Sequence, residues 1–88
     1  MPEYTITFAQ SARKDLERLS ASIVNRVFLK IEALAQNPRP SGCRKLQGLE
    51  NLWRIRVGDY RVVYQVIDEE LVVDIVAVRH RSKAYRPR

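Results

Sequence analysis

Cysteine is nearly absent from this chain, and its scarcity excludes several classes of protein. Cys43 is the single cysteine among 88 residues, so an internal disulfide framework and a multi-cysteine zinc site are both excluded. Low cysteine use is typical of a reducing compartment, and we therefore expect a cytoplasmic protein.

Long apolar runs are missing as well. No stretch approaches the 18 residues of a membrane span, and the amino terminus, Met1-Pro2-Glu3, lacks the basic and apolar segments of a signal peptide. We expect no membrane association and one domain over residues 1–88. A chain of this length buries only about 60–65% of its unfolded surface. It has room for one sheet and one or two helices, but not for a large cofactor pocket.

Acidic residues are in the minority, and the imbalance is uneven along the chain. The net charge is +6, with a pI near 10.0. Residues 1–37 contain five basic and four acidic side chains, whereas residues 38–88 contain eleven and six. A basic half beside a nearly neutral half indicates a polyanionic partner for the carboxyl-terminal half. The alternative is that this charge only keeps the protein soluble.

The segment Leu52–Tyr64 carries the strongest local pattern. Apolar residues alternate with arginines up to Gly58-Asp59, which has the period of a β-strand and ends in a two-residue hairpin turn. Counting from that turn, Arg56 lies opposite Arg61, and Arg54 shares their face. Opposed like charges about 5 Å apart at Cβ cost stability. We expect these arginines to hold an anion, because the guanidinium fork matches phosphate oxygens.

The rest of the chain predicts an α+β fold of order β-α-α-β-β-β, in which two amino-terminal helices pack on one face of an antiparallel sheet. The expected elements are a strand over Tyr4–Phe8, a helix over Lys14–Leu19 capped by Ser11, a helix from Ser20 or Ser22 to Asn37-Pro38, the hairpin strands Leu52–Val57 and Tyr60–Ile67, and a strand over Leu71–Val78.

The hairpin register also predicts the two faces of the sheet. The expected core side carries Ile55, Val57, Val62, Tyr64 and Val66. The other face carries Arg54, Arg56 and Arg61, and the basic tail that begins at Arg79 can fold back over it. A one-residue slip of the turn would exchange the two faces.

Several motifs give the chain a resemblance to a known family. They are the segment Leu46–Leu49, the hairpin Trp53–Tyr64 and the ending His80–Tyr85. With the order of elements, they resemble the RelE/ParE superfamily of toxin–antitoxin toxins, a microbial-RNase-like fold, over about residues 3–86. Within the superfamily the chain is similar to the RelE branch.

The resemblance implies a toxin that arrests growth by cleaving mRNA in the ribosomal A site, with no metal or cofactor. It also implies a RelB-like antitoxin as partner, contact with 16S ribosomal RNA, and operator DNA binding through the antitoxin. Carried over position by position, the implied catalytic residues are Arg54, Arg56, Arg61, Arg81 and Tyr85, and the implied substrate-binding residues are Lys45, His80 and Lys83.

Three positions depart from the family pattern. Arg54 and Arg56 stand where well-known members carry lysines, and Arg79 stands where glycine is common. Arginine is a poor base because its pKa exceeds about 12, so we expect the arginines to act as electrostatic clamps. Tyr85 is then the candidate general base, with His80 as the alternative.

Two other functions remain open from the sequence. ParE-like toxins, which inhibit DNA gyrase, share the fold but usually lack the combined basic clamp and terminal tyrosine. A non-catalytic basic module would bind RNA with strong salt dependence and leave it intact.

Overall fold

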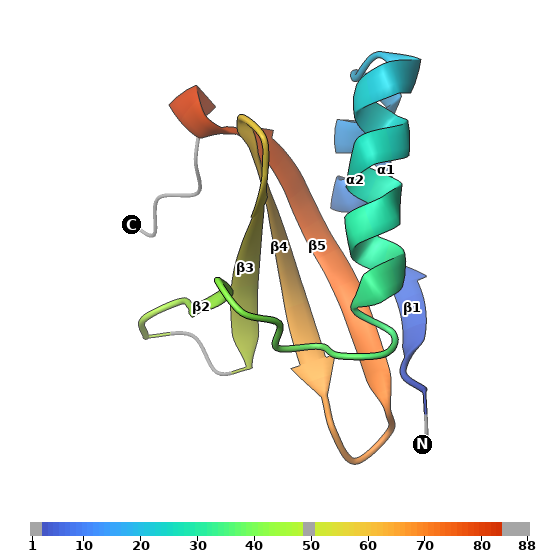
Figure 1. The fold of residues 1–88 in the computed structure, drawn as a ribbon, viewed down its shortest axis with the longest axis vertical. Helices are drawn as coiled ribbons and strands as arrows, with labels where there is room; N and C mark the ends of the chain where they lie inside the picture. The colour runs from blue at the N-terminus through green and yellow to red at the C-terminus, as the bar shows by residue number, and fades with distance from the viewer. Residues whose placement is uncertain (1–2, 49–50, 84–88) are drawn as a thin grey trace.

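The structure, a computed structural model, describes residues 3–48 and 51–83. The described elements form one sheet and two α-helices that lie together on one side of it (Figure 1). In chain order they are β1 (Thr5–Phe8), α1 (Gln10–Glu17), α2 (Ala21–Ala33), β2 (Arg44–Lys45), β3 (Leu52–Val57), β4 (Tyr60–Ile67), β5 (Val72–His80) and the 3₁₀ turn η1 (Arg81–Lys83).

The strands lie in the order β1-β5-β4-β3-β2. The α+β class and the helices on one face are confirmed, but the sheet is mixed rather than antiparallel. β1 pairs parallel with β5, while the pairs β2–β3, β3–β4 and β4–β5 are antiparallel. The parallel pair joins strands from opposite ends of the chain, so no hairpin turn fixes its direction. The short strand β2 was not predicted.

The hairpin register is confirmed. Val57 pairs with Tyr60, Arg56 with Arg61, and Arg54 with Val63. Gly58 has a φ of 59°, the positive value that glycine supplies at the first turn position of a two-residue hairpin. This turn fixes which side chains of β3 and β4 share a face.

The helices begin and end differently from the prediction. α1 begins at Gln10 with Ala9 at the N-cap position, so Ser11 is not the cap. Its hydroxyl instead donates to the carbonyl oxygen of Val76, at 2.6 Å. Ser20 does cap α2, but that helix ends at Ala33, before Asn37-Pro38. Neither helix of the described ranges is long and apolar enough to cross a bilayer.

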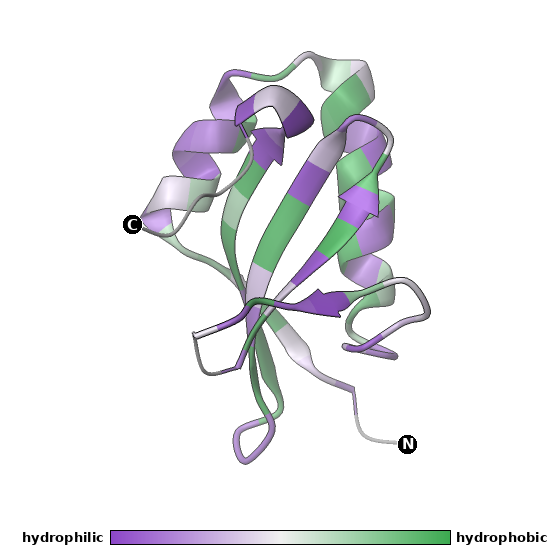
Figure 2. Cartoon of the chain, turned by 90° about the vertical axis from the view of Figure 1, so that its left-hand side faces the viewer, coloured by the Kyte–Doolittle hydropathy of each residue, from purple (hydrophilic) through white to green (hydrophobic). Residues whose placement is uncertain are grey.

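The core lies between the helices and the covered face of the sheet. The five hairpin residues predicted for the core side are all buried there. Figure 2 shows hydrophobic and hydrophilic residues alternating along strands of the sheet. The largest fully buried side chains are Tyr64, Ile31, Leu34, Ile75, Val27, Val62, Val66 and Val73. Burial at this level supplies most of the stability of a small domain.

The segment between α2 and β2 is fastened to the sheet by polar contacts. The buried Tyr64 hydroxyl donates to the carbonyl oxygen of Pro38 at 2.7 Å, and burial raises the pKa of that phenol. Arg39 donates to both carboxylate oxygens of Asp68, at 3.3 and 2.8 Å, and its guanidinium carbon lies 5.1 Å from the ring centre of Trp53. These contacts fix the path of the chain toward β2.

A bulge interrupts the pairing of β4 with β5. Val63 pairs with Ala77, whereas the next residue, Tyr64, pairs with Ile75. Val76 is therefore an extra residue on β5, and beyond it the side chains exchange faces. Without the bulge, Arg79 would point to the helices and His80 to the open face.

Candidate functional site

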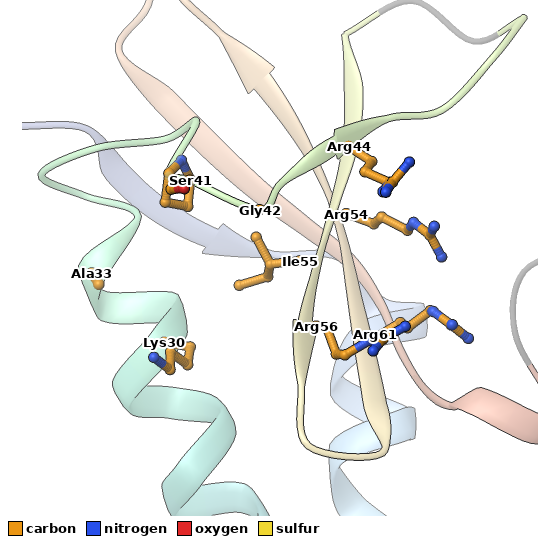
Figure 3. A pocket seen from close by; sticks show the side chains of 10 residues that line it. Lys30, Ala33, Ser41, Gly42, Arg44, Arg54, Ile55, Arg56 and Arg61 are labelled. Atoms are coloured by element: carbon orange, nitrogen blue, oxygen red, sulfur yellow. The ribbon is translucent and has the colours of Figure 1, made fainter.

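The open face of the sheet, opposite the helices, carries a ladder of arginines. Arg44 pairs with Arg54 across β2 and β3, and Arg56 pairs with Arg61 across β3 and β4. Figure 3 shows Arg44, Arg54 and Arg61 extending to the side of the hairpin opposite α2, while Ile55 points toward α2. Directly paired side chains are about 5 Å apart at Cβ. We call Arg44, Arg54, Arg56 and Arg61 the arginine ladder.

A hollow of about 480 Å³ lies along β3 and takes in the whole arginine ladder. It is also lined by Lys30 and Ala33 of α2 and by the turn residues Pro40, Ser41 and Gly42. No acidic side chain belongs to this lining within the described residues. An excess of cations around an open hollow indicates an anionic ligand.

The electrostatics of Arg54 show how crowded these charges are. Burial lowers the pKa of Arg54 from its ordinary value, and the charges of Arg61, Arg44 and Arg56 lower it further. Each of these causes disfavours the charged guanidinium. A bound phosphate would remove the repulsion, because an anion favours the charged form of every arginine around it.

Arg81 joins the arginine ladder through a second, smaller hollow. This hollow, of about 80 Å³, is lined by Arg56, Gly58, Asp59, Tyr60, Arg61 and Arg81. The Arg81 backbone N–H donates to the carbonyl oxygen of Asp59 at 2.7 Å, and its Nε lies 4.0 Å from the Asp59 carboxylate. The hairpin turn thus fixes the start of η1 close to Arg56 and Arg61.

Comparisons with known proteins identify the family of this chain. The family model described as ParE toxin of type II toxin-antitoxin system, parDE, matches residues 6–85. The mRNA interferase toxin RelE of Escherichia coli strain K12 is 33% identical over 86 residues, covering 93% of this chain and 90% of its own. Toxin RelE of Mycobacterium tuberculosis is 37% identical over 87 residues, covering 94% and 87%. The chain belongs to the RelE/ParE superfamily of type II toxin–antitoxin toxins.

Solved structures of RelE toxins share the fold. The RelBE2 toxin–antitoxin complex of Mycobacterium tuberculosis contains a chain with a TM-score of 0.82 and 32% identity, covering 94% of this chain and 97% of that one. The intact Escherichia coli RelBE complex gives 0.79 and 32%, covering 94% and 99%. The chain is thus a toxin of the RelE family.

Two arginines near this site were not predicted as site residues. Arg44 enters the arginine ladder through β2, a two-residue strand too short to give a pattern. Arg79 pairs with Arg61 across β4 and β5, so it extends the row formed by Arg56 and Arg61. Only the bulge at Val76 brings Arg79 to that face, and a bulge leaves no periodic signal in the sequence.

The other predicted RelE-type residues lie elsewhere or outside the described residues. Lys45 is exposed on β2 and pairs with Trp53, which faces the core side. His80 pairs with Tyr60, and their rings meet edge to face at 5.3 Å. Lys83 lines the same hollow as His80, of about 390 Å³, on the helix side of β5. Tyr85 lies outside the described residues.

The structure also bears on metal binding. Across residues 3–48 and 51–83, no three histidine, cysteine, aspartate or glutamate side chains gather as metal ligands would.

His80 Nδ1 lies 2.8 Å from the Ser82 hydroxyl and accepts from the Ser82 backbone N–H at 3.1 Å. These contacts make His80 part of the turn that begins η1.

Proposed function

We propose that this toxin is an endoribonuclease that cleaves mRNA in the ribosomal A site without a metal. The observation that carries the proposal is the arginine ladder, a set of cations with no acid in its described lining. An mRNA backbone is an anion of regular spacing, and the arginine fork pairs with two phosphate oxygens at once. The relative named mRNA interferase toxin RelE supports the same class of activity.

In the proposed reaction the RNA supplies its own nucleophile. The 2′-hydroxyl gives its proton to a general base and attacks the adjacent phosphorus, a 2′-O–P bond forms, and the P–O5′ bond breaks; the product is a 2′,3′-cyclic phosphate, and the departing 5′-oxygen takes up a proton from water. Arg54, Arg56, Arg61 and Arg81 stabilise the charge that develops on the phosphoryl oxygens. Arg44, beside Arg54, and Arg79, beside Arg61, hold the neighbouring phosphates. None of these arginines removes the 2′-OH proton, because guanidinium does not readily lose its own.

Tyr85 is the proposed general base. An ordinary tyrosine has a pKa near 10, but surrounding arginines would favour the phenolate and bring that value closer to neutrality. Tyr85→Phe keeps the ring and removes the proton acceptor, so cleavage should fall about 10²–10⁴-fold. Near-full activity of this variant would move the role to another group, of which His80 is the first candidate.

The proposed partners follow from the same charge distribution. Two of the related structures are complexes of RelE with its antitoxin RelB, and we propose a RelB-like antitoxin for this chain. An acidic or amphipathic antitoxin segment would mask the arginines, while its own DNA-binding domain would contact the operator. Lys45, His80 and Lys83 are proposed to contact mRNA or 16S ribosomal RNA.

The test is to induce the toxin in a bacterial host and map new 5′ ends of mRNA. Three chains are compared: wild type, the double variant Arg61→Ala with Arg81→Ala, and Arg13→Ala. Arg13 is an exposed α1 arginine outside both arginine hollows, so it controls for the loss of a positive charge. Growth arrest with codon-phased cuts in wild type and Arg13→Ala, but not in the double variant, is expected.

Two other results would overturn the proposal. Growth arrest with intact messages and accumulated DNA breaks would identify a ParE-like gyrase inhibitor. Binding to RNA that weakens with salt, without arrest or cleavage, would identify a basic RNA-binding module. Purified toxin mixed with free mRNA, and with the same mRNA on ribosomes, then separates direct from ribosome-dependent cleavage.

A further inference from the structure

The outer edge of β5 is covered by a helix where its neighbouring strand ends. β1 pairs with β5 only as far as Ile75. Beyond that residue, the Ser11 hydroxyl donates to the carbonyl oxygen of Val76 at 2.6 Å, and the Val78 N–H donates to Asp15 Oδ2 at 2.9 Å. Side chains of α1 thus satisfy backbone groups that a further strand would otherwise pair.

Both contacts fall at the bulge. The Ser11 hydroxyl binds the backbone carbonyl of Val76, the extra residue, and the Asp15 carboxylate binds the backbone N–H of Val78, two residues later. The bulge decides the face to which every later side chain of β5 points. The pairing of Arg79 with Arg61 therefore depends on a part of β5 whose backbone is hydrogen-bonded to side chains of α1.

Asp15 makes a second contact, to Arg79 itself. Its Oδ2 lies 3.5 Å from Arg79 Nε. The Asp15 side chain is 16% exposed, against 47% for Arg79, so the carboxylate is held in the protein while the guanidinium reaches solvent. Asp15 approaches Arg79 at Nε, and the terminal nitrogens are the part of the guanidinium that would bind a phosphate oxygen.

We infer that Asp15 is a positioning residue for RNA cleavage, acting through Arg79. One carboxylate oxygen fixes the β5 backbone just past the bulge and also orients the guanidinium that extends the row of Arg56 and Arg61. The inference rests on the proposed function, because the row must bind an RNA phosphate for the position of Arg79 to matter. Neither Asp15 nor Arg79 lines the two arginine hollows; both line the hollow of about 390 Å³ on the helix side of β5, so Asp15 acts from outside the arginine ladder.

The test compares Asp15→Asn with Glu17→Gln in cleavage of a defined mRNA on ribosomes at saturating ribosome concentration. Both changes remove one negative charge from α1, but Glu17 is exposed and has no part in the contacts to β5. The asparagine carbonyl still accepts from the Val78 N–H, while the charge facing Arg79 is lost. We expect Asp15→Asn to cleave about 10- to 100-fold more slowly and Glu17→Gln to match wild type.

A double-mutant cycle with Arg79→Gln separates positioning from a general structural effect. If Asp15 acts through Arg79, adding Asp15→Asn to Arg79→Gln should change the cleavage rate by no more than about twofold, because coupled residues are not additive. Hydrogen exchange of the Val78 amide should stay protected in Asp15→Asn and become faster in Asp15→Ala.

Each alternative result has a distinct meaning. Wild-type cleavage rates in Asp15→Asn, or a full additive loss in the double variant, would overturn the positioning role and leave the proposed function intact. A wild-type chain that cleaves no RNA, free or on ribosomes, would overturn both. The cleavage activity of the wild-type protein alone therefore distinguishes the two failures.

Discussion

The two faces of the sheet use strand residues for opposite purposes. On the face covered by α1 and α2, β4 and β5 contribute apolar side chains such as Val62, Val66, Val73 and Ile75, each with no exposed surface. On the open face, the same hairpin places like charges in direct opposition, at Arg56 and Arg61. The apolar side chains of the covered face lower the free energy of the fold, and the opposed arginines of the open face raise it.

A second comparison, between two arginines, explains the difference. Arg39 is paired with Asp68 and stacked on Trp53, and the hydrogen bond that it donates to Asp68 raises its pKa. Arg54 lies among other arginines, and burial together with their charges lowers its pKa. An arginine paired with a carboxylate stabilises the fold. An arginine surrounded by other arginines destabilises it, and a bound anion would remove that repulsion.

Shortening a residue of the covered face should damage the fold. Ile75→Ala removes a fully buried side chain, and we expect a loss of about 2–5 kcal/mol in the free energy of unfolding. Urea denaturation measures this loss. Leu29→Ala is the matched control, because Leu29 is 69% exposed and should change stability by less than about 0.5 kcal/mol. Equal losses in both variants would contradict the described core.

Removing a charge from the open face should damage activity and spare the fold. Arg61→Ala should slow mRNA cleavage on ribosomes about 10²–10³-fold, the usual cost of one lost electrostatic clamp. Its free energy of unfolding should stay level or rise, because a repulsion with Arg56 is relieved. Cleavage assays and urea denaturation on the same preparation check both. A variant that loses activity only because it unfolds would show the opposite pattern.

Salt dependence should separate crowded from paired arginines. The affinity for single-stranded RNA should fall with salt, and each lost phosphate contact should reduce the slope of log K against log salt by about 0.7. We expect that reduction in Arg54→Ala and none in Arg39→Ala, measured by fluorescence anisotropy between low and moderate salt. Identical slopes for the two variants would mean that RNA does not distinguish the arginine ladder from the rest of the surface.

The smallest effect should appear in the pH dependence of stability. Hydrogen bonds from Arg39 and Tyr4 hold the pKa of Asp68 below its ordinary value of 3.8. Because the folded pKa is depressed, this contribution is complete above pH 3.8 and is lost as the pH falls through the folded value. The difference in thermal midpoint between wild type and Asp68→Asn should therefore be constant near neutrality and shrink in acid. An increase toward acid would contradict the sign.

Much of the fold was predictable because its signals are local. The alternation around Gly58-Asp59 fixed the register of β3 with β4, and of the two predicted helix starts, Ser20 and Ser22, the structure has Ser20 as the cap of α2. The boundaries of α1 were less predictable, because Ser11 is used to bind β5 instead of capping the helix. The placement of Arg54, Arg56 and Arg61 on one open face followed from the same register.

The sequence by itself determined the hairpin, the two helices and the basic half that carries the arginines, because short-range periodicity and turn chemistry decide these features. Only the tertiary structure decided the parallel pairing of β1 with β5, the entry of Arg44 through β2, and the bulge that turns Arg79 toward Arg61. The parallel pairing and the contacts at the bulge join segments far apart in the chain, and β2 is too short to give a pattern. α1, from the opposite end of the sequence, supplies the side chains that hold the bulge in place.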